Sequence, residues 1–182
     1  TDAAEATATH ETEIVASIKE TQAAFPGLRQ ELVDKGFPKK AIDSARRVRP
    51  LEKGSDAYGG SGSGANFKFA RGGKNYIGLL SVWHVLEIFP ADKTELLLTD
   101  VDGQNFLEEK VGIARDTDKE DGLAVAVFED TGKYGGDVFE EGDLGFDTPE
   151  ARMIFYGVGW PTEVGNQDPH VVVGGDIFEM SE

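Results

Sequence analysis

The first third of the chain places its hydrophobic residues at helical spacing. Apolar side chains recur every three or four residues between Glu11 and Phe25, again from Leu28 to Gly36, and from Pro38 to Arg49. Proline and glycine at the two junctions end one helix before the next begins. We therefore expect a small helical appendage over residues 1–49, with its first ten residues frayed.

Glycine and short apolar runs replace this pattern farther along the chain. Residues 50–64 are rich in glycine and form a linker by composition. From residue 65 onward the apolar runs are short, and turns containing Gly and Asp separate them. These runs are Phe67–Phe69, Tyr76–Val82, Glu95–Thr99, Leu123–Phe128, Met153–Val158 and His170–Val173. The pattern predicts an all-β fold, an antiparallel barrel or sandwich, over residues 65–182.

The net charge bears on the partners of the protein. Thirty-four acidic side chains outnumber 18 basic ones, which gives a formal charge of −16. A nucleic acid site would need a concentrated basic patch against that background. The helical spacing of the one basic run predicts a solvated helix face instead, so we expect no nucleic acid partner. That run is Lys39, Lys40, Arg46, Arg47 and Arg49.

The absence of cysteine excludes disulfides, thiol nucleophiles and cysteine-ligated zinc sites. No run of 18 apolar residues is present, so we expect a soluble protein without a membrane span. The sequence opens with Thr-Asp-Ala-Ala-Glu and has no basic-then-apolar signal. This opening fits either export with removal of a leader or a start inside a longer chain, and the compartment stays open.

Only one of the three histidines has an informative position. His10 lies in the polar start, and His170 opens an apolar run beside a loop, so we expect no catalytic role for either. His84 ends the run from Tyr76 to Leu86, where an imidazole at the inner end of a buried strand needs a polar partner. Taken alone, His84 is open to two interpretations: a hydrogen-bonded core histidine or a catalytic base.

The order of the segments around His84 adds information. Gly60-Ser-Gly-Ser-Gly64 precedes a short strand and a Gly-Lys-Asn turn, and Ser81-Val-Trp-His84-Val85 ends the next strand. Asp121 comes 37 residues after His84, directly before Gly122-Leu-Ala-Val-Ala-Val127. This order resembles the first barrel of the trypsin-like (chymotrypsin-fold) serine proteases, especially the bacterial Deg-type members.

Two later segments extend the resemblance into the second barrel of that family. Residues 154–161 are similar to a strand that ends in Gly-x-Pro, and residues 171–177 are similar to the strand that follows it. The resemblance therefore covers about residues 60–178. It implies a trypsin-like double β-barrel whose second barrel is incomplete, preceded by the helical appendage.

The resemblance also implies a function, which is peptide-bond hydrolysis by a serine endopeptidase acting on a polypeptide substrate. His84 would be the general base, and Asp121 would accept its second ring N–H and stabilise the imidazolium. Gly122 separates Asp121 from the apolar run, whereas the family mostly places the two together, so Asp118 and Glu120 stay open as alternative acids. Trp83 also departs from the small residue that the family usually has before the histidine.

The largest departure concerns the nucleophile. The family's glycine-rich serine turn follows the aspartate, but the only serine after Asp121 is Ser181, which has no glycine beside it. Ser61 and Ser63 lie between glycines but precede His84. We therefore expect this chain alone not to hydrolyse peptide bonds, and we expect a complementing chain or C-terminal segment to supply the serine. A non-catalytic binding or structural module on the same barrel, and an unrelated β-domain with a structural His84, stay open.

The remaining expectations concern metals and geometry. Residues 116–122 depart from a calcium loop because the glycine comes late and Val127 takes the place of the bidentate glutamate, so we expect no metal and no cofactor. His84 and Asp121 should approach to hydrogen-bonding distance, with His84 at the mouth of a cleft between the barrels. Because the appendage is expected outside the barrels, deleting residues 1–50 should leave the β-domain folded.

Overall fold

The computed structural model describes residues 27–52, 60–87, 94–110, 112–150, 154–160 and 170–176. These residues form mainly antiparallel β-sheet with a few short helices, and the prediction of an all-β fold is confirmed at that level. The helices are α2 (Leu28–Asp34), α3 (Lys39–Ser44), α4 (Trp83–Leu86) and the 3-10 turn η2 (Glu141–Asp143). The strands are β1 (Ala45–Glu52), β2 (Gly62–Arg71), β3 (Lys74–Val82), β4 (Thr94–Thr99), β5 (Asn105–Glu109), β6 (Gly112–Arg115), β7 (Leu123–Glu129), β8 (Phe139–Glu140), β9 (Ile154–Gly159) and β10 (His170–Asp176).

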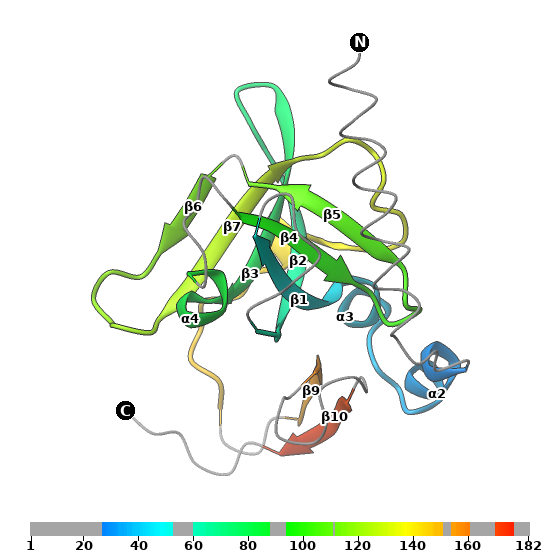
Figure 1. Cartoon of the computed structure of the whole chain (residues 1–182). Helices are drawn as coiled ribbons and strands as arrows, with labels where there is room; N and C mark the ends of the chain where they lie inside the picture. The colour runs from blue at the N-terminus through cyan, green and yellow to red at the C-terminus, as the bar shows by residue number, and fades with distance from the viewer. Residues whose placement is uncertain are drawn as a thin grey trace.

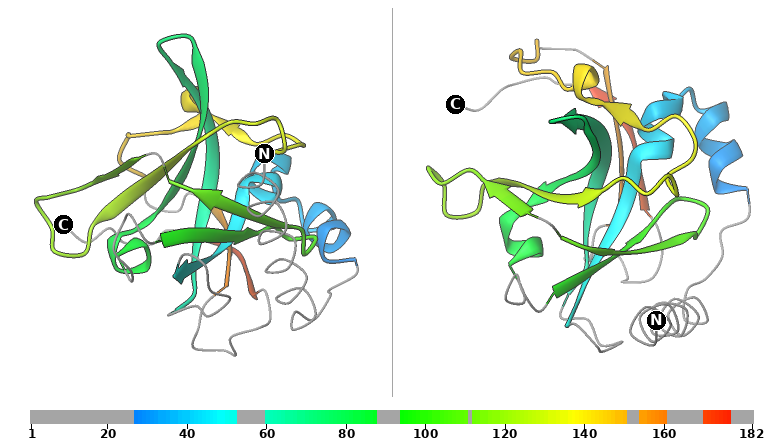
Figure 2. Two further views of the ribbon diagram at one scale, coloured as in Figure 1. Left: turned by 45° about the horizontal axis from the view of Figure 1, so that its top comes forward. Right: turned by 90° about the horizontal axis from the view of Figure 1, so that it is seen from above.

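The main sheet has the strand order β5-β4-β1-β2-β3-β7-β6, and β8 pairs with β2 beside this path (Figure 1). Every neighbouring pair along the path is antiparallel. The strands at the two ends of the path, β5 and β6, are successive in the chain and are separated only by residues 110 and 111. Figure 2 shows that the sheet is strongly curved.

Local sequence explains the β2–β3 hairpin. Gly72 and Gly73 have φ values of 59° and 78°, the left-handed conformation that a two-residue hairpin turn requires and that glycine adopts without strain. The Gly-rich turn expected at this place is thereby confirmed. The turn fixes the register of the hairpin, in which Phe67 lies opposite Gly78.

The principal core lies on the inner side of the curved sheet. It contains buried aliphatic and aromatic side chains from most strands, and Val85 and Leu86 of α4 complete it. Alternate residues of β7 show the expected period of two, because Ala124, Ala126 and Phe128 are buried while Leu123 and Glu129 are exposed. The sequence predicted this strand from the short apolar run Leu123–Phe128 and the turns beside it, and the alternation in burial appears only in the structure.

A second, smaller core joins the helices to β9. Leu32, Phe37 and Ile42 pack with Val101 and Trp160. The antiparallel pair β9–β10 lies below the main sheet in Figure 1, and its strands fall on the two apolar runs predicted near residues 153 and 170. The backbone N–H of Trp160 donates to Ser63 Oγ at 2.7 Å, which ties β9 to β2.

The helical prediction for residues 1–49 is correct in part. Residues 28–34 and 39–44 are helical, but residues 45–49 belong to β1. The physical reason is that β1 buries both faces: Val48 points into the principal core, and Leu51 packs with Leu97 on the other side. The expected helix over residues 11–25 lies outside the described residues.

The interpretation of the basic run as a solvated helix face is wrong for its arginines. Arg46, Arg47 and Arg49 lie on β1 and are only 1–2 % exposed. Arg46 donates to the carbonyl oxygens of Asp43 and Ala45. Its guanidinium also lies over the rings of Phe106 and Tyr134 in the principal core. Burial of this guanidinium is partly offset because Nη1 donates to two carbonyls and the guanidinium lies over aromatic rings, although Nε is buried without a hydrogen-bond partner.

The predicted linker over residues 50–64 is also shorter than expected where it is described. Its first three residues continue β1, and residues 62–64 begin β2, while residues 53–59 lie outside the described residues. Pro50 is accommodated in β1 because the pairing with β2 ends at Val48, so no neighbour on that side needs the missing N–H.

Within the described part of the chain, none of the helices has the length and hydrophobicity to cross a bilayer.

Candidate active site

The pairing of β3 with β7 brings His84 and Asp121 together. These strands are antiparallel, and the last pair in their register is Val82 with Leu123. The ladder continues one step further, because the backbone N–H of Trp83 donates to the carbonyl of Gly122 at 3.0 Å. The next position on each side is His84 and Asp121, so the register itself places one opposite the other.

Two hydrogen bonds join His84 to the Asp121 carboxylate. Ring atom Nδ1 lies 2.6 Å from Oδ2, and the backbone N–H of His84 donates to Oδ1 at 2.9 Å. The expectation of an approach to hydrogen-bonding distance is confirmed. Each carboxylate oxygen has its own donor, so the carboxylate plane is fixed relative to the start of α4.

The protonation state follows from these contacts. The hydrogen bonds from the His84 ring and backbone lower the pKa of the Asp121 carboxyl below its usual value, and the charge of Arg115 acts in the same direction. An ionised carboxylate only accepts hydrogen bonds, so Nδ1 carries the proton in this pair. In the neutral imidazole, Nε2 then holds the free lone pair, which is the arrangement that a general base needs.

Exposure separates the interpretations left open for His84. Its side chain is 62 % exposed and that of Asp121 is 50 % exposed. A core histidine would be buried, so that interpretation is wrong. Asp118 and Glu120 also face solvent, and among these three candidate acids only Asp121 accepts hydrogen bonds from His84.

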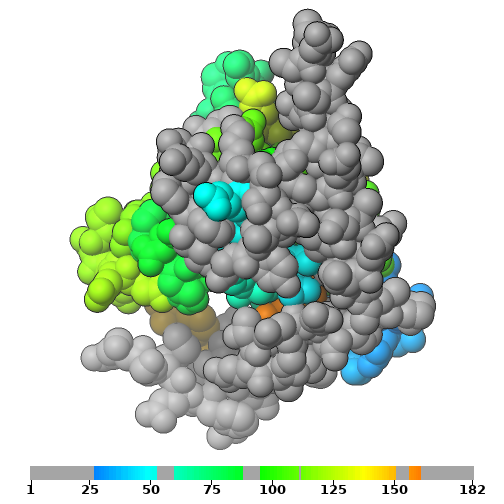
Figure 3. Space-filling model, in the orientation of Figure 1, coloured from blue at the N-terminus to red at the C-terminus, as the bar shows by residue number. Residues whose placement is uncertain are grey.

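Gly122 lets the Asp121 loop fold tightly. A side chain at this buried position would meet Cβ of Asp116 at 3.0 Å and Cβ of Lys119 at 3.4 Å. The glycine that looked like a departure from the family pattern therefore has a local packing reason. Figure 3 shows the green surface of α4 adjoining the yellow-green surface of the β6–β7 turn at the left edge of this face.

The serines considered from the sequence make other contacts. Ser61 Oγ accepts a hydrogen bond from Nε of Arg47 at 3.0 Å, and Ser63 Oγ accepts the bond from Trp160 already described. Ser181 and His10 lie outside the described residues, and His170 is described only as the first residue of β10. The described residues thus bring a histidine and a carboxylate together at one place, and no described serine is hydrogen-bonded to that histidine.

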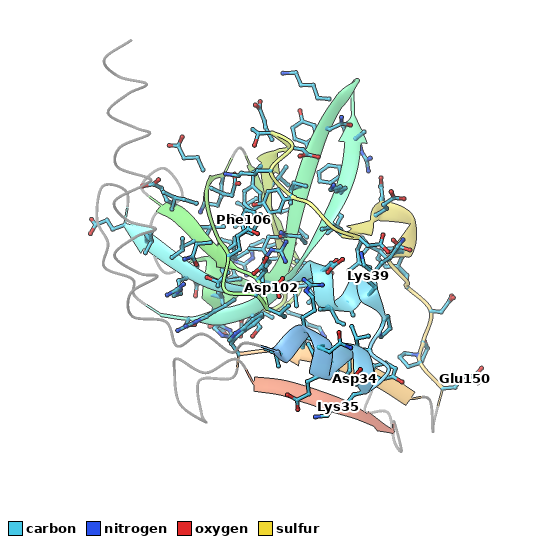
Figure 4. All side chains as sticks on the ribbon, turned by 90° about the vertical axis from the view of Figure 1, so that its right-hand side faces the viewer. Asp34, Lys35, Lys39, Asp102, Phe106 and Glu150 are labelled. Atoms are coloured by element: carbon cyan, nitrogen blue, oxygen red, sulfur yellow. The ribbon has the colours of Figure 1, made fainter. Side chains whose placement is uncertain are left out.

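Two cavities lie away from this pair. One, of about 230 Å³, is lined by residues of α2, β1, the β4–β5 turn and residues 135–136. Arg46 lines it with its guanidinium over the rings of Phe106 and Tyr134, at 5.3 and 5.8 Å. Figure 4 views the molecule from this side, with Asp102 beside the helices. The other, of about 460 Å³, opens near Lys68 and Glu140, and neither is lined by His84 or Asp121.

The described residues contain no group of three or more histidine or carboxylate side chains placed to hold a metal ion. In the acidic loop considered from the sequence, the Asp116 carboxylate accepts the backbone N–H of Asp118 at 2.9 Å. This is a turn-forming bond within the loop.

Sequence reasoning missed Arg115 as a neighbour of the site. Its guanidinium carbon lies 4.2 Å from the centre of the Trp83 ring, and Nη2 donates to the carbonyls of Glu120 and Lys119. Arg115 ends β6, and its place depends on the pairing of β6 with β7. No motif at residue 115 carries that signal.

No family model matches this chain, and no curated protein or solved structure matches it either. The assignment of a function consequently rests on the geometry of His84 and Asp121 and on the order of the strands that carry them.

Proposed function

We propose that this chain belongs to the lineage of trypsin-like serine endopeptidases and carries the general base and the orienting acid of peptide-bond hydrolysis. The observation that supports this most directly is the two-point contact of Asp121 with the ring and the backbone N–H of His84. A carboxylate held in this way sets both the tautomer and the direction of the imidazole. That is the role of the aspartate in a Ser-His-Asp triad.

The arrangement of the strands supports the same proposal. A strongly curved antiparallel sheet, with the histidine shortly after one strand and the aspartate shortly before its antiparallel neighbour, fits the first barrel of that family. In this proposal β9 and β10 are the first strands of the second barrel, which further strands would complete. The trypsin-like double barrel is thus part of the proposal.

The chemistry assigned to the chain's own residues is a proton transfer in two directions. His84 Nε2 accepts the proton of a serine hydroxyl as that oxygen attacks the peptide carbonyl, and the Asp121 carboxylate stabilises the imidazolium that forms. The imidazolium then gives its proton to the leaving amine. The serine and the backbone N–H groups that stabilise the oxyanion come, in this proposal, from a complementing chain or C-terminal segment.

The proposal is tested with a serine-directed fluorophosphonate probe and a casein cleavage assay. Both are applied to the purified 182-residue chain and to the complete product of its gene, whatever its extent. We expect no labelling and no cleavage with the 182-residue chain. We expect labelling and cleavage with the complete product, both reduced at least about a thousandfold by His84→Ala.

Two other results are informative. If the complete product folds but neither reacts with the probe nor cleaves casein, the endopeptidase proposal is contradicted and a non-catalytic binding or structural module takes its place. If the 182-residue chain itself is labelled stoichiometrically and the labelling disappears in His84→Ala, a nucleophile is present within this sequence. The expected inactivity of the chain alone is then wrong.

A further inference from the structure

One arginine contacts both short segments that carry the candidate base and acid. Arg115, at the end of β6, lies over the indole of Trp83 at 4.2 Å. From the same guanidinium, Nη2 donates to the carbonyl of Glu120 at 3.1 Å and of Lys119 at 3.3 Å. Trp83 directly precedes His84, and Glu120 directly precedes Asp121.

The shape of the guanidinium makes this double contact possible. Its flat face can stack on an aromatic ring while the N–H groups at its edge donate hydrogen bonds in the same plane. A lysine ammonium has the charge but lacks the flat face and the fixed directions of its donors. The contact therefore depends on arginine and not only on a positive charge.

We propose that Arg115 is a positioning residue that holds the Asp121 loop and the start of α4 together, so that Asp121 keeps its two hydrogen bonds to His84. The inference rests on the proposed role of His84 and Asp121 as base and orienting acid. It adds a residue that reacts with nothing itself and acts through both of them.

The site needs such a contact because His84 and Asp121 are both half exposed or more. Water competes for the hydrogen bonds of exposed groups, and a loop without further ties samples other conformations. The segment from Asp116 to Glu120 is exposed throughout. The two bonds from Arg115 to its carbonyls tie it to the sheet.

The test is the tautomer of neutral His84, measured by 15N NMR of the purified 182-residue chain at a pH where the imidazole is uncharged. In the unmodified chain we expect the Nδ1–H form to predominate, because Asp121 accepts that proton. Asp121→Asn is the reference that removes the carboxylate. We expect Arg115→Lys and Arg115→Gln each to lower the ratio of Nδ1–H to Nε2–H at least about threefold, the effect of weakening one hydrogen bond.

Arg71 supplies a matched control. It also lies over an aromatic ring, that of Phe69 at 5.4 Å, and it is exposed and ion-paired with Glu141. Arg71→Lys should leave the His84 tautomer unchanged. A general loss of stability would not alter the tautomer within the folded population, so circular dichroism of each variant is sufficient to show that the measured molecules are folded.

The outcomes separate this inference from the proposed function. If Asp121→Asn changes the tautomer but Arg115→Lys does not, the positioning role of Arg115 is contradicted and the proposed function stands. If neither Asp121→Asn nor Arg115→Lys changes the tautomer, Asp121 does not orient His84. The proposed function is then contradicted, and the inference about Arg115, which rests on it, is contradicted with it. Should Arg115→Gln unfold the chain, Arg115→Lys decides, since it keeps the charge and the aliphatic stem.

Discussion

At the scale of single residues, the buried carboxylate of Asp43 accepts hydrogen bonds from three different residues. Its side chain is 5 % exposed and accepts from the Arg29 guanidinium, from Lys39 Nζ at 3.0 Å and from the backbone N–H of Asp137 at 2.8 Å. It thus links α2, α3 and the loop before β8. Burial by itself would raise the pKa of this carboxyl, but the hydrogen bonds outweigh it and bring the pKa to about 2.

We expect Asp43→Asn to lower the free energy of unfolding by about 2 kcal/mol at neutral pH, because the amide cannot replace an ionised acceptor for two cations. A carboxyl pKa below the ordinary 3.8 stabilises the fold above that pH. This stabilisation is lost as the pH falls from about 4 towards 2. The difference between the two proteins in urea unfolding should therefore shrink over that interval. A difference that is independent of pH would contradict this account.

At the scale of elements, the β2–β3 hairpin depends on the glycine opposite Phe67. In that cross-strand pair, the Phe67 ring lies over Gly78 so closely that a Cβ at residue 78 would contact three ring atoms. An aromatic ring placed over a strand glycine covers backbone that would otherwise lie open. The hairpin ends at Val82, two residues before His84, so its packing bears on the site.

We expect Gly78→Ala to destabilise the protein by about 1–3 kcal/mol, because the added methyl group must displace the Phe67 ring. Gly112→Ala is the matched control. Gly112 is also a strand glycine of the same sheet, but a Cβ there would meet no atom within 4 Å. Urea unfolding of both variants checks this, and equal effects of the two substitutions would argue against ring packing as the cause.

At the scale of the whole molecule, β1 is the strand that joins the two halves of the sheet. It pairs with β2 over residues 45–48 and with β4 over residues 47–52. Without β1, β2 and β4 would each present an unpaired edge. The principal core would also lose Val48, and the cluster around Leu97 would lose Leu51. The sequence led us to expect that the β-domain stays folded without residues 1–50. Because β1 lies partly within this segment, we now expect the deletion to disrupt the fold.

We expect a chain lacking residues 1–50 to lose cooperative thermal unfolding, measured by circular dichroism. Val48→Asp in the full chain should have the same effect, because it buries an unpaired charge in the principal core. Glu52→Gln, at the exposed end of the same strand, should change stability by less than about 0.5 kcal/mol. Sigmoidal unfolding of the truncated chain would show that β1 is dispensable.

The net charge of −16 is also a property of the whole molecule. Repulsion among that many like charges opposes a compact state, and salt screens it. We expect the midpoint of thermal unfolding to rise between about 0.02 and 0.5 M NaCl. A falling midpoint would mean that exposed ion pairs such as Arg71–Glu141 stabilise the fold more than the net charge destabilises it.

The sequence by itself determined what depends on neighbouring residues. The short apolar run Leu123–Phe128 between turn residues indicated β7, and the turn at Gly72 and Gly73 needs a backbone conformation that glycine supplies, so both were predicted. The approach of His84 to Asp121 was predicted as well. That prediction rested on the resemblance of the segment order to the trypsin-like proteases, because the two residues are 37 positions apart and meet through the non-local pairing of β3 with β7.

Only the tertiary structure decided what depends on distant segments. The arginines of β1 are buried because segments farther along the chain supply hydroxyls and rings to them, and a basic run carries no trace of such partners. For the same reason the sequence indicated a helix over residues 45–49, where both faces of a strand are in fact covered. Arg115 meets Trp83 only after β6, β7 and β3 have paired, so its contact with the candidate site is a consequence of the fold.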